Sequence, residues 1–129
     1  MPFLIYDYID KHGQNAFREW ALEQQKAPLG KLNERIDLLS LYGETLFPHM
    51  LTNTGVAGIL KLRIQGPVKL RPLLCRGPVN NQSEYTLLMG AKEIGSEWKP
   101  KGAPSIAAML KAEVIKNPTT RRATHERVF

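Results

Sequence analysis

The fold is decided by residues 59–75, which read ILKLRIQGPVKLRPLLC. On both sides of Gly66 and Pro67, apolar and polar side chains alternate with the period of two residues that is typical of β-strands. The pattern predicts two strands, over 59–65 and 68–75. Because only Gly66 and Pro67 separate them, we expect a tight antiparallel hairpin.

The same alternation sorts the cations of this hairpin. Lys61 and Arg63 share one face of the first strand, and Lys69 and Arg71 alternate with apolar residues in the second. A turn about Gly66 sets Arg63 opposite Lys69 and Lys61 opposite Arg71, so the four cations are expected on one open face. Facing like charges cost roughly 0.2–1 kcal/mol per pair, a cost that a bound phosphate backbone reverses. Alternatively, the long side chains splay into water without a ligand.

The rest of the chain predicts a single α+β domain over residues 1–129. Residues 2–9 read as a strand, and Asn15 is placed to cap a first helix that ends near 27–28. A second amphipathic run ends before Gly43, and 43–58 reads as a loop. A third strand over 85–89, a helix over 104–116 and a basic tail over 117–129 follow. We therefore expect an N-terminal strand and a helical hairpin packed on a small antiparallel sheet, with a C-terminal helix and a basic tail.

The charge is unevenly distributed along the chain. Apolar residues make up 43% and charged residues 23% of the sequence, as in a soluble globular protein. Residues 1–56 hold five basic and seven acidic residues, whereas residues 57–129 hold thirteen basic and five acidic ones. Such asymmetry indicates a polyanionic partner, and its alternative is a merely well-charged surface. No secretion leader or membrane span is recognisable, so a cytoplasmic protein without a membrane partner is expected.

Metal and cofactor chemistry find little support in the residues. Cys75 lies in an apolar run and reads as a small buried hydrophobe. His12, His49 and His125 are far apart without metal-ligand spacing, and no glycine-rich phosphate loop opens a helix. We expect no metal, no small-molecule cofactor and a cation-lined surface. RNA suits such a surface, because its 2'-hydroxyl can attack the adjacent phosphate while cations stabilise the developing charge.

Further basic residues lie late in the chain as candidate nucleic-acid ligands: Lys92, Lys99, Lys101, Arg121, Arg122, His125 and Arg127. Arginine offers a two-pronged donor for phosphate, and Trp98, which directly precedes Lys99 and lies near Lys101 in the sequence, could stack on an exposed base. Equally, Trp98 could cover the edge of the sheet.

Several short motifs, which follow one another in a characteristic order and spacing, together cover nearly the whole chain. They are Tyr8-Ile9-Asp10 with Gly13, Phe17 and Trp20; Gly43, Leu46 and Pro48; Leu60-Lys61-Leu62-Arg63-Ile64; Arg71; Leu87-Leu88-Met89-Gly90-Ala91-Lys92; and the Pro104 helix ending in Asn117-Pro118. In these motifs the sequence resembles the RelE/ParE toxin superfamily, specifically its phage-associated HigB-like branch.

The resemblance implies a RelE-like microbial RNase-like fold and a toxin of a toxin-antitoxin system. Such a toxin is a ribosome-dependent, metal-independent endoribonuclease, or mRNA interferase, and a small DNA-binding antitoxin neutralises it. By position, Arg63 and Arg71 would bind phosphate or stabilise the transition state, and Lys92 would lie near the scissile bond. His125 or Tyr85 would replace the family's acid or base at the strand end.

The sequence departs from the family pattern in two places. Leu70 stands where the branch commonly has Tyr before the arginine, and Glu93 stands where it commonly has a second lysine after Lys92. Two other functions therefore stay open. One is a phage or prophage module of the same fold that binds RNA or the ribosome without cutting, and the other is a ParE-like gyrase inhibitor.

Overall fold

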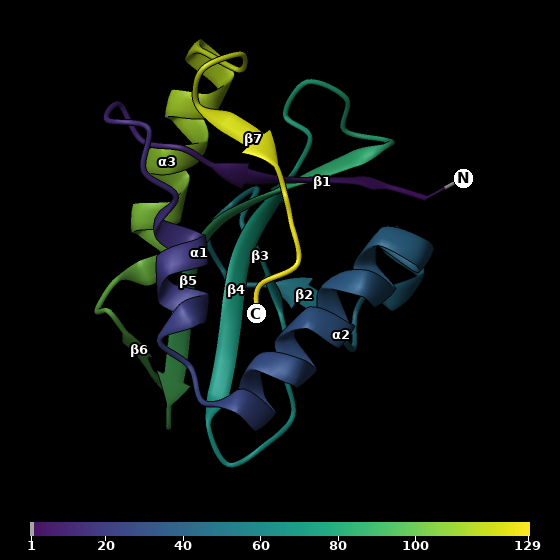
Figure 1. Cartoon of the computed structure of the whole chain (residues 1–129), viewed down its shortest axis with the longest axis vertical. Helices are drawn as coiled ribbons and strands as arrows, with labels where there is room; N and C mark the ends of the chain where they lie inside the picture. The colour runs from purple at the N-terminus through teal and green to yellow at the C-terminus, as the bar shows by residue number, and fades with distance from the viewer. Residues whose placement is uncertain (1) are drawn as a thin grey trace.

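A mixed β-sheet of seven strands forms the centre of the protein, in a computed structural model that describes residues 2–129 (Figure 1). The α+β class expected from the sequence is confirmed. In chain order the elements are β1 (Leu4–Tyr8), α1 (Ala16–Leu22), α2 (Lys26–Tyr42), a 3-10 turn η1 (Gly43–Leu46), β2 (Leu51–Asn53), β3 (Leu60–Leu62), β4 (Lys69–Arg76), β5 (Glu84–Ile94), β6 (Glu97–Lys99), α3 (Ala103–Lys116) and β7 (Arg122–Thr124).

The sheet is not purely antiparallel, so that part of the expectation is wrong. The strand order is β2-β3-β4-β5-β1-β7, with β6 paired to β5. Strand β1 lies parallel to β5, with Leu4 opposite Glu84 and Asp7 opposite Leu87. Parallel neighbours require a long crossover, and here the helices and three strands between β1 and β5 supply it. Strand β1 therefore belongs to the sheet itself rather than packing on it.

The register of β3 against β4 also differs from the expected one. Lys61 is opposite Leu73, and Leu60 is opposite Leu74. The strands are shifted by two residues because a longer loop, not a turn at Gly66, connects them. A shift of two keeps each side chain on its expected face, so the leucine face remains in the core.

Helices α1 and α2 cover one face of the sheet. Phe17 and Ala21 of α1 and Leu32 of α2 are buried with Leu62 and Leu87 in one core cluster. Asn15 caps α1 as predicted, its side chain accepting a hydrogen bond from the Arg18 backbone N–H. The expected boundary at 27–28 is wrong: α1 ends at Leu22 and α2 begins at Lys26. Pro28 is tolerated in the first turn of α2, because the backbone N–H groups of the first turn have no acceptor within the helix.

Helix α3 covers the opposite face, and its bounds agree with the prediction. Its small buried residues Ala103 and Ala107 pack with Leu73, Cys75 and Leu88 in a second core cluster. Cys75 is fully buried, as expected, and burial raises the pKa of its thiol to about 11. The central strand β4 is therefore enclosed by helices on both faces.

Three short strands were not predicted. Strand β2 lies within the stretch expected to be a loop, β6 follows a turn at Gly95 and Ser96, and β7 lies within the basic tail. The tail crosses the molecule and ends between α1 and α2 (Figure 1), where Val128 is buried beside Asn33. The tail is thus part of the folded domain.

Candidate anion-binding site

A pair of lysines faces each other at one end of the sheet. Lys92 of β5 and Lys99 of β6 are direct partners in the antiparallel register. The two strands are joined by the turn at Gly95 and Ser96, in which Gly95 has a φ of 64°, a conformation that favours glycine. The turn fixes the register, and the register brings the two ammonium-bearing side chains together.

Lys69 of β4 lines a hollow together with this pair, although its register partner is Glu93, so its side chain leaves the strand on the opposite face of the sheet to Lys92 and Lys99. A hollow of about 420 Å³ lies among the ends of these strands. Its lining is Pro67, Val68, Lys69, Lys92, Glu93, Ile94, Gly95 and Lys99. Within residues 2–129, Lys69, Lys92 and Lys99 make no ion pair. We call Lys69, Lys92 and Lys99 the lysine cluster.

A second hollow, of about 460 Å³, adjoins the lysine cluster on the α1 side of the sheet. It is lined by Trp20, Glu23, Gln24, Lys92, Lys99 and Pro100. The two hollows share Lys92 and Lys99, so one bound chain could occupy both. This second hollow was not predictable from the sequence, because Trp20 and Glu23 read as ordinary residues of an amphipathic helix.

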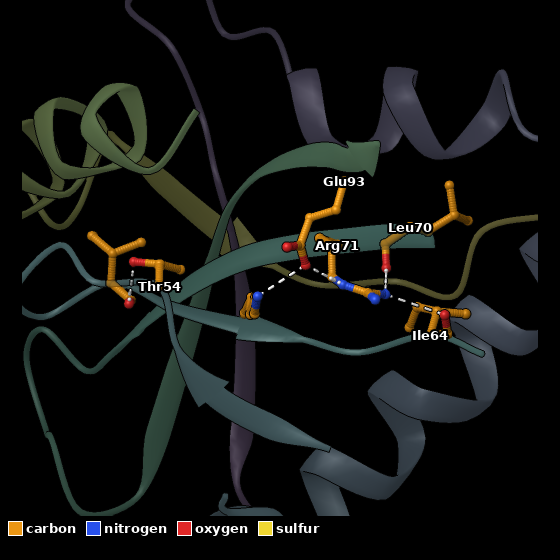
Figure 2. A network of polar contacts seen from close by, with 7 residues as sticks. Thr54, Ile64, Leu70, Arg71 and Glu93 are labelled. Carbon is orange, nitrogen blue, oxygen red and sulfur yellow. Dashed lines mark hydrogen bonds and ion pairs between the residues drawn. The ribbon is translucent and has the colours of Figure 1, made fainter. Parts of the chain in front are cut away.

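Arg71 does not belong to an open cationic face. Its Nε donates to Glu93 Oε1 at 2.6 Å, and its Nη1 donates to the carbonyl oxygens of Ile64 at 3.2 Å and Leu70 at 2.8 Å (Figure 2). Lys61 donates to the same Glu93 oxygen at 2.9 Å. The side chains of Arg71 and Lys61 are only 8% and 13% exposed.

The expectation of four cations on one open face is therefore wrong. Lys61 and Arg71 are neutralised in part by Glu93 and lie beside the region that α3 covers, whereas Arg63 and Lys69 are exposed. Burial alone would raise the pKa of Glu93, but the hydrogen bonds from Lys61 and Arg71 outweigh burial and leave that pKa below its ordinary value. The three groups form a structural ion-pair network.

Three further candidate residues have different surroundings: Arg63, Trp98 and Lys101. The backbone carbonyl of Arg63 accepts a hydrogen bond from the Arg35 guanidinium, and the Arg63 side chain is exposed. Trp98 is half-buried against the core under α3, with the Lys61 ammonium 5.2 Å from its ring centroid. Lys101 is exposed in the turn before α3.

Each basic residue of the tail is bonded to a carboxylate elsewhere in the fold. Arg121 bonds Glu113 at 2.8 Å, and Arg122 bonds the buried Glu84 and lies 3.9 Å from the centroid of the Tyr6 ring. His125 and Arg127 bond Asp7 and Asp37. These pairs hold β7 and the chain after it against the domain, and none of the four lines either lysine hollow.

His125 forms a buried dyad with Asp7. The His125 Nδ1 lies 2.8 Å from Asp7 Oδ1, and the side chains are 7% and 3% exposed. Asn15 donates to the other Asp7 oxygen at 2.8 Å. His125 lines a separate hollow of about 310 Å³ beside α2 that shares no residue with the two lysine hollows. A carboxylate-bound imidazole can hold or transfer a proton, but here it is not directed at the lysine cluster.

Tyr85, the other candidate acid or base, is likewise bonded elsewhere. Its buried hydroxyl donates to Glu44, which also binds Arg76 through two hydrogen bonds of 3.0 and 2.6 Å. Burial, together with the Glu44 carboxylate, raises the pKa of Tyr85 well above its usual range. The structure thus brings together Lys69, Lys92 and Lys99, but neither His125 nor Tyr85.

Comparisons with protein-family models, curated proteins and solved structures give no significant match to this chain. No helix within residues 2–129 is both long and apolar enough to cross a membrane. Over the same residues, no group of three or more histidine, cysteine, aspartate and glutamate side chains is arranged to hold a metal ion.

Proposed function

We propose that this protein binds single-stranded RNA at the lysine cluster and acts there as a ribosome-dependent mRNA interferase. The observation that carries the proposal is the direct opposition of Lys92 and Lys99, with Lys69 nearby. Facing ammonium groups repel each other, and a phosphate between them turns that repulsion into attraction. Ammonium groups are also strongly hydrated point charges that bind phosphate without reading sequence.

Cleavage is proposed through attack of the RNA 2'-hydroxyl on the adjacent phosphate, which breaks the bond between phosphorus and the 5'-oxygen of the next nucleotide and leaves a 2',3'-cyclic phosphate. Water takes the proton from the 2'-hydroxyl and supplies one to the departing 5'-oxygen. Lys92 would stabilise the charge that develops on the phosphate oxygens, in agreement with the role that the resemblance to RelE/ParE toxins implies for it. Arg63 and Lys101 are further exposed cations outside the cluster. A toxin of this kind works on ribosomes in the cytoplasm and is neutralised by a small antitoxin.

A second candidate function is RNA or ribosome binding without cleavage, in a phage or prophage module. One observation favours it: the side chains expected to perform the chemistry are already engaged. Arg71 is bound to Glu93 and two carbonyls, His125 to Asp7, and Tyr85 to Glu44. The lysine cluster can hold RNA, but the two candidate proton donors, His125 and Tyr85, are bonded to carboxylates elsewhere in the fold.

One experiment separates these functions. The chain is expressed from an inducible promoter, and mRNA from the cells is mapped by primer extension, with a parallel reaction on purified mRNA with and without ribosomes. Cuts that require ribosomes, and that are lost in Lys92→Ala, support the interferase. The matched control is Lys116→Ala, which removes an exposed lysine at the end of α3.

Intact mRNA together with RNA or ribosomes that co-purify with the chain supports the binding module. Growth arrest with intact mRNA and double-strand DNA breaks would identify a gyrase inhibitor instead and overturn the RNA proposal. If neither Lys92→Ala nor Lys99→Ala changes RNA binding, the lysine cluster is not the site.

A further inference from the structure

The hollow beside α1 has the components of a site for one nucleobase. It shares Lys92 and Lys99 with the hollow that also holds Lys69, so a base in it stays connected to phosphates at the lysine cluster. Its volume of about 460 Å³ exceeds what a purine needs. Its other lining residues are an aromatic ring, a carboxylate, a carboxamide and Pro100. The inference drawn here rests on the RNA-binding function proposed above.

Trp20 supplies an aromatic surface whose position is fixed by packing. Its indole packs against the backbone of Gly90 in β5, where a methyl group would overlap the ring. Phe17 lies beside it, with the ring centroids 5.7 Å apart. A ring held in this way loses little freedom when a base stacks on it, and stacking alone does not distinguish one base from another.

The polar groups next to Trp20 are hydrogen-bond acceptors. Glu23, the C-cap residue directly after α1, is exposed and makes no side-chain hydrogen bond or ion pair within residues 2–129. The Gln24 Nε2 donates one of its two hydrogens to the Trp20 carbonyl at 2.9 Å, and the Gln24 Oε1 stays free to accept. A carboxylate repels phosphate, so Glu23 would weaken a site that bound only the RNA backbone.

We propose that this hollow is a guanine-binding subsite, in which Trp20 stacks on the base and the Glu23 carboxylate accepts from its Watson–Crick edge. Of the four RNA bases, only guanine presents two adjacent donors there, N1–H and the N2 amino group. A carboxylate has two acceptor oxygens in matching geometry. Adenine, cytosine and uracil each place an acceptor next to their donor, which would face the carboxylate unfavourably.

The test measures the binding of four fluorescein-labelled RNA pentamers, UUGUU, UUAUU, UUCUU and UUUUU, by fluorescence anisotropy. Because a bidentate base contact discriminates by an amount that corresponds to about tenfold or more in affinity, UUGUU is expected to bind at least about tenfold more tightly than the other three. In Glu23→Gln the preference should disappear, while the affinity for UUUUU stays the same or rises. The matched control Glu19→Gln changes an exposed glutamate of α1 outside the hollow and should keep the preference.

The possible failures are distinguishable. If all four pentamers bind equally, or if the guanine preference survives Glu23→Gln, the subsite is refuted and RNA binding at the lysine cluster stands. If no pentamer binds the wild-type chain, the proposed function fails together with the subsite. Trp20→Leu is the second variant: it should weaken all four pentamers, and unchanged binding would overturn the stacking role.

Discussion

Lys92 on β5 lies directly opposite Lys99 on β6, in a pair of strands that a tight turn holds in register. The two residues line both hollows at this end of the sheet. In the free protein the arrangement costs stability, whereas a bound polyanion would reverse the sign of the interaction. Stability and binding should therefore respond in opposite directions when one of the two charges is removed.

Lys99→Gln is expected to stabilise the free protein and to weaken its binding of RNA. Loss of the facing charge should raise the free energy of unfolding by roughly 0.2–1 kcal/mol. The slope of log affinity for single-stranded RNA against log salt should become shallower by about 0.7, because one phosphate contact is lost. Urea denaturation and anisotropy titrations at several salt concentrations measure the two effects.

Lys101→Gln is the control for the effect on stability, because it removes the same charge from an exposed turn without a lysine across from it. Its free energy of unfolding should stay within the error of the wild-type value. A loss of stability in Lys99→Gln would show that the two ammonium groups do not repel each other measurably.

Glu93→Gln should destabilise the protein by removing the shared partner of Arg71 and Lys61. Breaking a fully buried pair costs about 3–5 kcal/mol, and the partial exposure of Glu93 reduces the expected loss to about 2 kcal/mol. Glu97→Gln, an exposed change on β6 outside the network, should have little effect. Equal stability of the Glu93→Gln and Glu97→Gln proteins would refute the structural role given to the network.

The network also predicts a pH dependence. The pKa of Glu93 is lower in the folded chain than the ordinary value of 4.5, because the hydrogen bonds from Lys61 and Arg71 outweigh burial. Its contribution to stability is therefore present above pH 4.5 and is lost as the pH falls through the folded-state pKa. When urea denaturation is measured between pH 7 and pH 3, the free energy of unfolding should fall less in Glu93→Gln than in the wild-type protein.

The hydrogen bond of the Tyr8 hydroxyl leads us to expect a loss of stability at alkaline pH. Its hydroxyl donates to Glu113 at 2.8 Å, and burial, together with this carboxylate, raises the pKa of Tyr8 from 10.0 to about 12. The contribution of the protonated Tyr8 hydroxyl to the free energy of unfolding is complete below pH 10 and is lost as the pH rises toward 12. Tyr8→Phe should lack this part of the loss when denaturation is measured between pH 8 and pH 11. The exposed Tyr42 serves as control, and Tyr42→Phe should follow wild type.

Much of the fold was predictable because it depends on local periodicity. The alternation of leucines and cations over 59–75 gave the correct face for each side chain, and Asn15 and Gly43 mark helix ends as expected. The register of β3 and β4 was not predictable, because Gly66 and Pro67 resemble a tight turn but lie in a longer loop. Strands of three residues, such as β6, are too short to show a period.

The candidate site was predictable only in part. Lys69, Lys92 and Lys99 could be chosen from the sequence, but their meeting depends on the pairing of β6 with β5. The burial of Arg71 could not be foreseen, because alternation says which residues share a face and not whether a helix covers that face. Glu93 is an acidic residue directly after Lys92 in a basic segment, and this position could have indicated a carboxylate partner for a buried cation.

Gly90→Ala tests the packing of Trp20 on β5. Any Cβ at this position would overlap the indole ring, and Gly90 is fully buried in the strand, so the ring must move. Overpacking of this kind costs about 1–3 kcal/mol. We expect a lower free energy of unfolding, measured by urea denaturation, and a shifted Trp20 fluorescence in the native state.

The control for this prediction has the opposite expected sign. Gly30 lies within α2 with no atom near the place of an added Cβ, so Gly30→Ala should stabilise the protein by about 0.4–1 kcal/mol through the lower entropy of the unfolded chain. If Gly90→Ala behaves like Gly30→Ala, Trp20 does not lie against β5, and the hollow beside α1 lacks its fixed aromatic surface. If Gly90→Ala is less stable than the wild-type protein and its tryptophan fluorescence is shifted, the position of Trp20 depends on the absence of a side chain at residue 90.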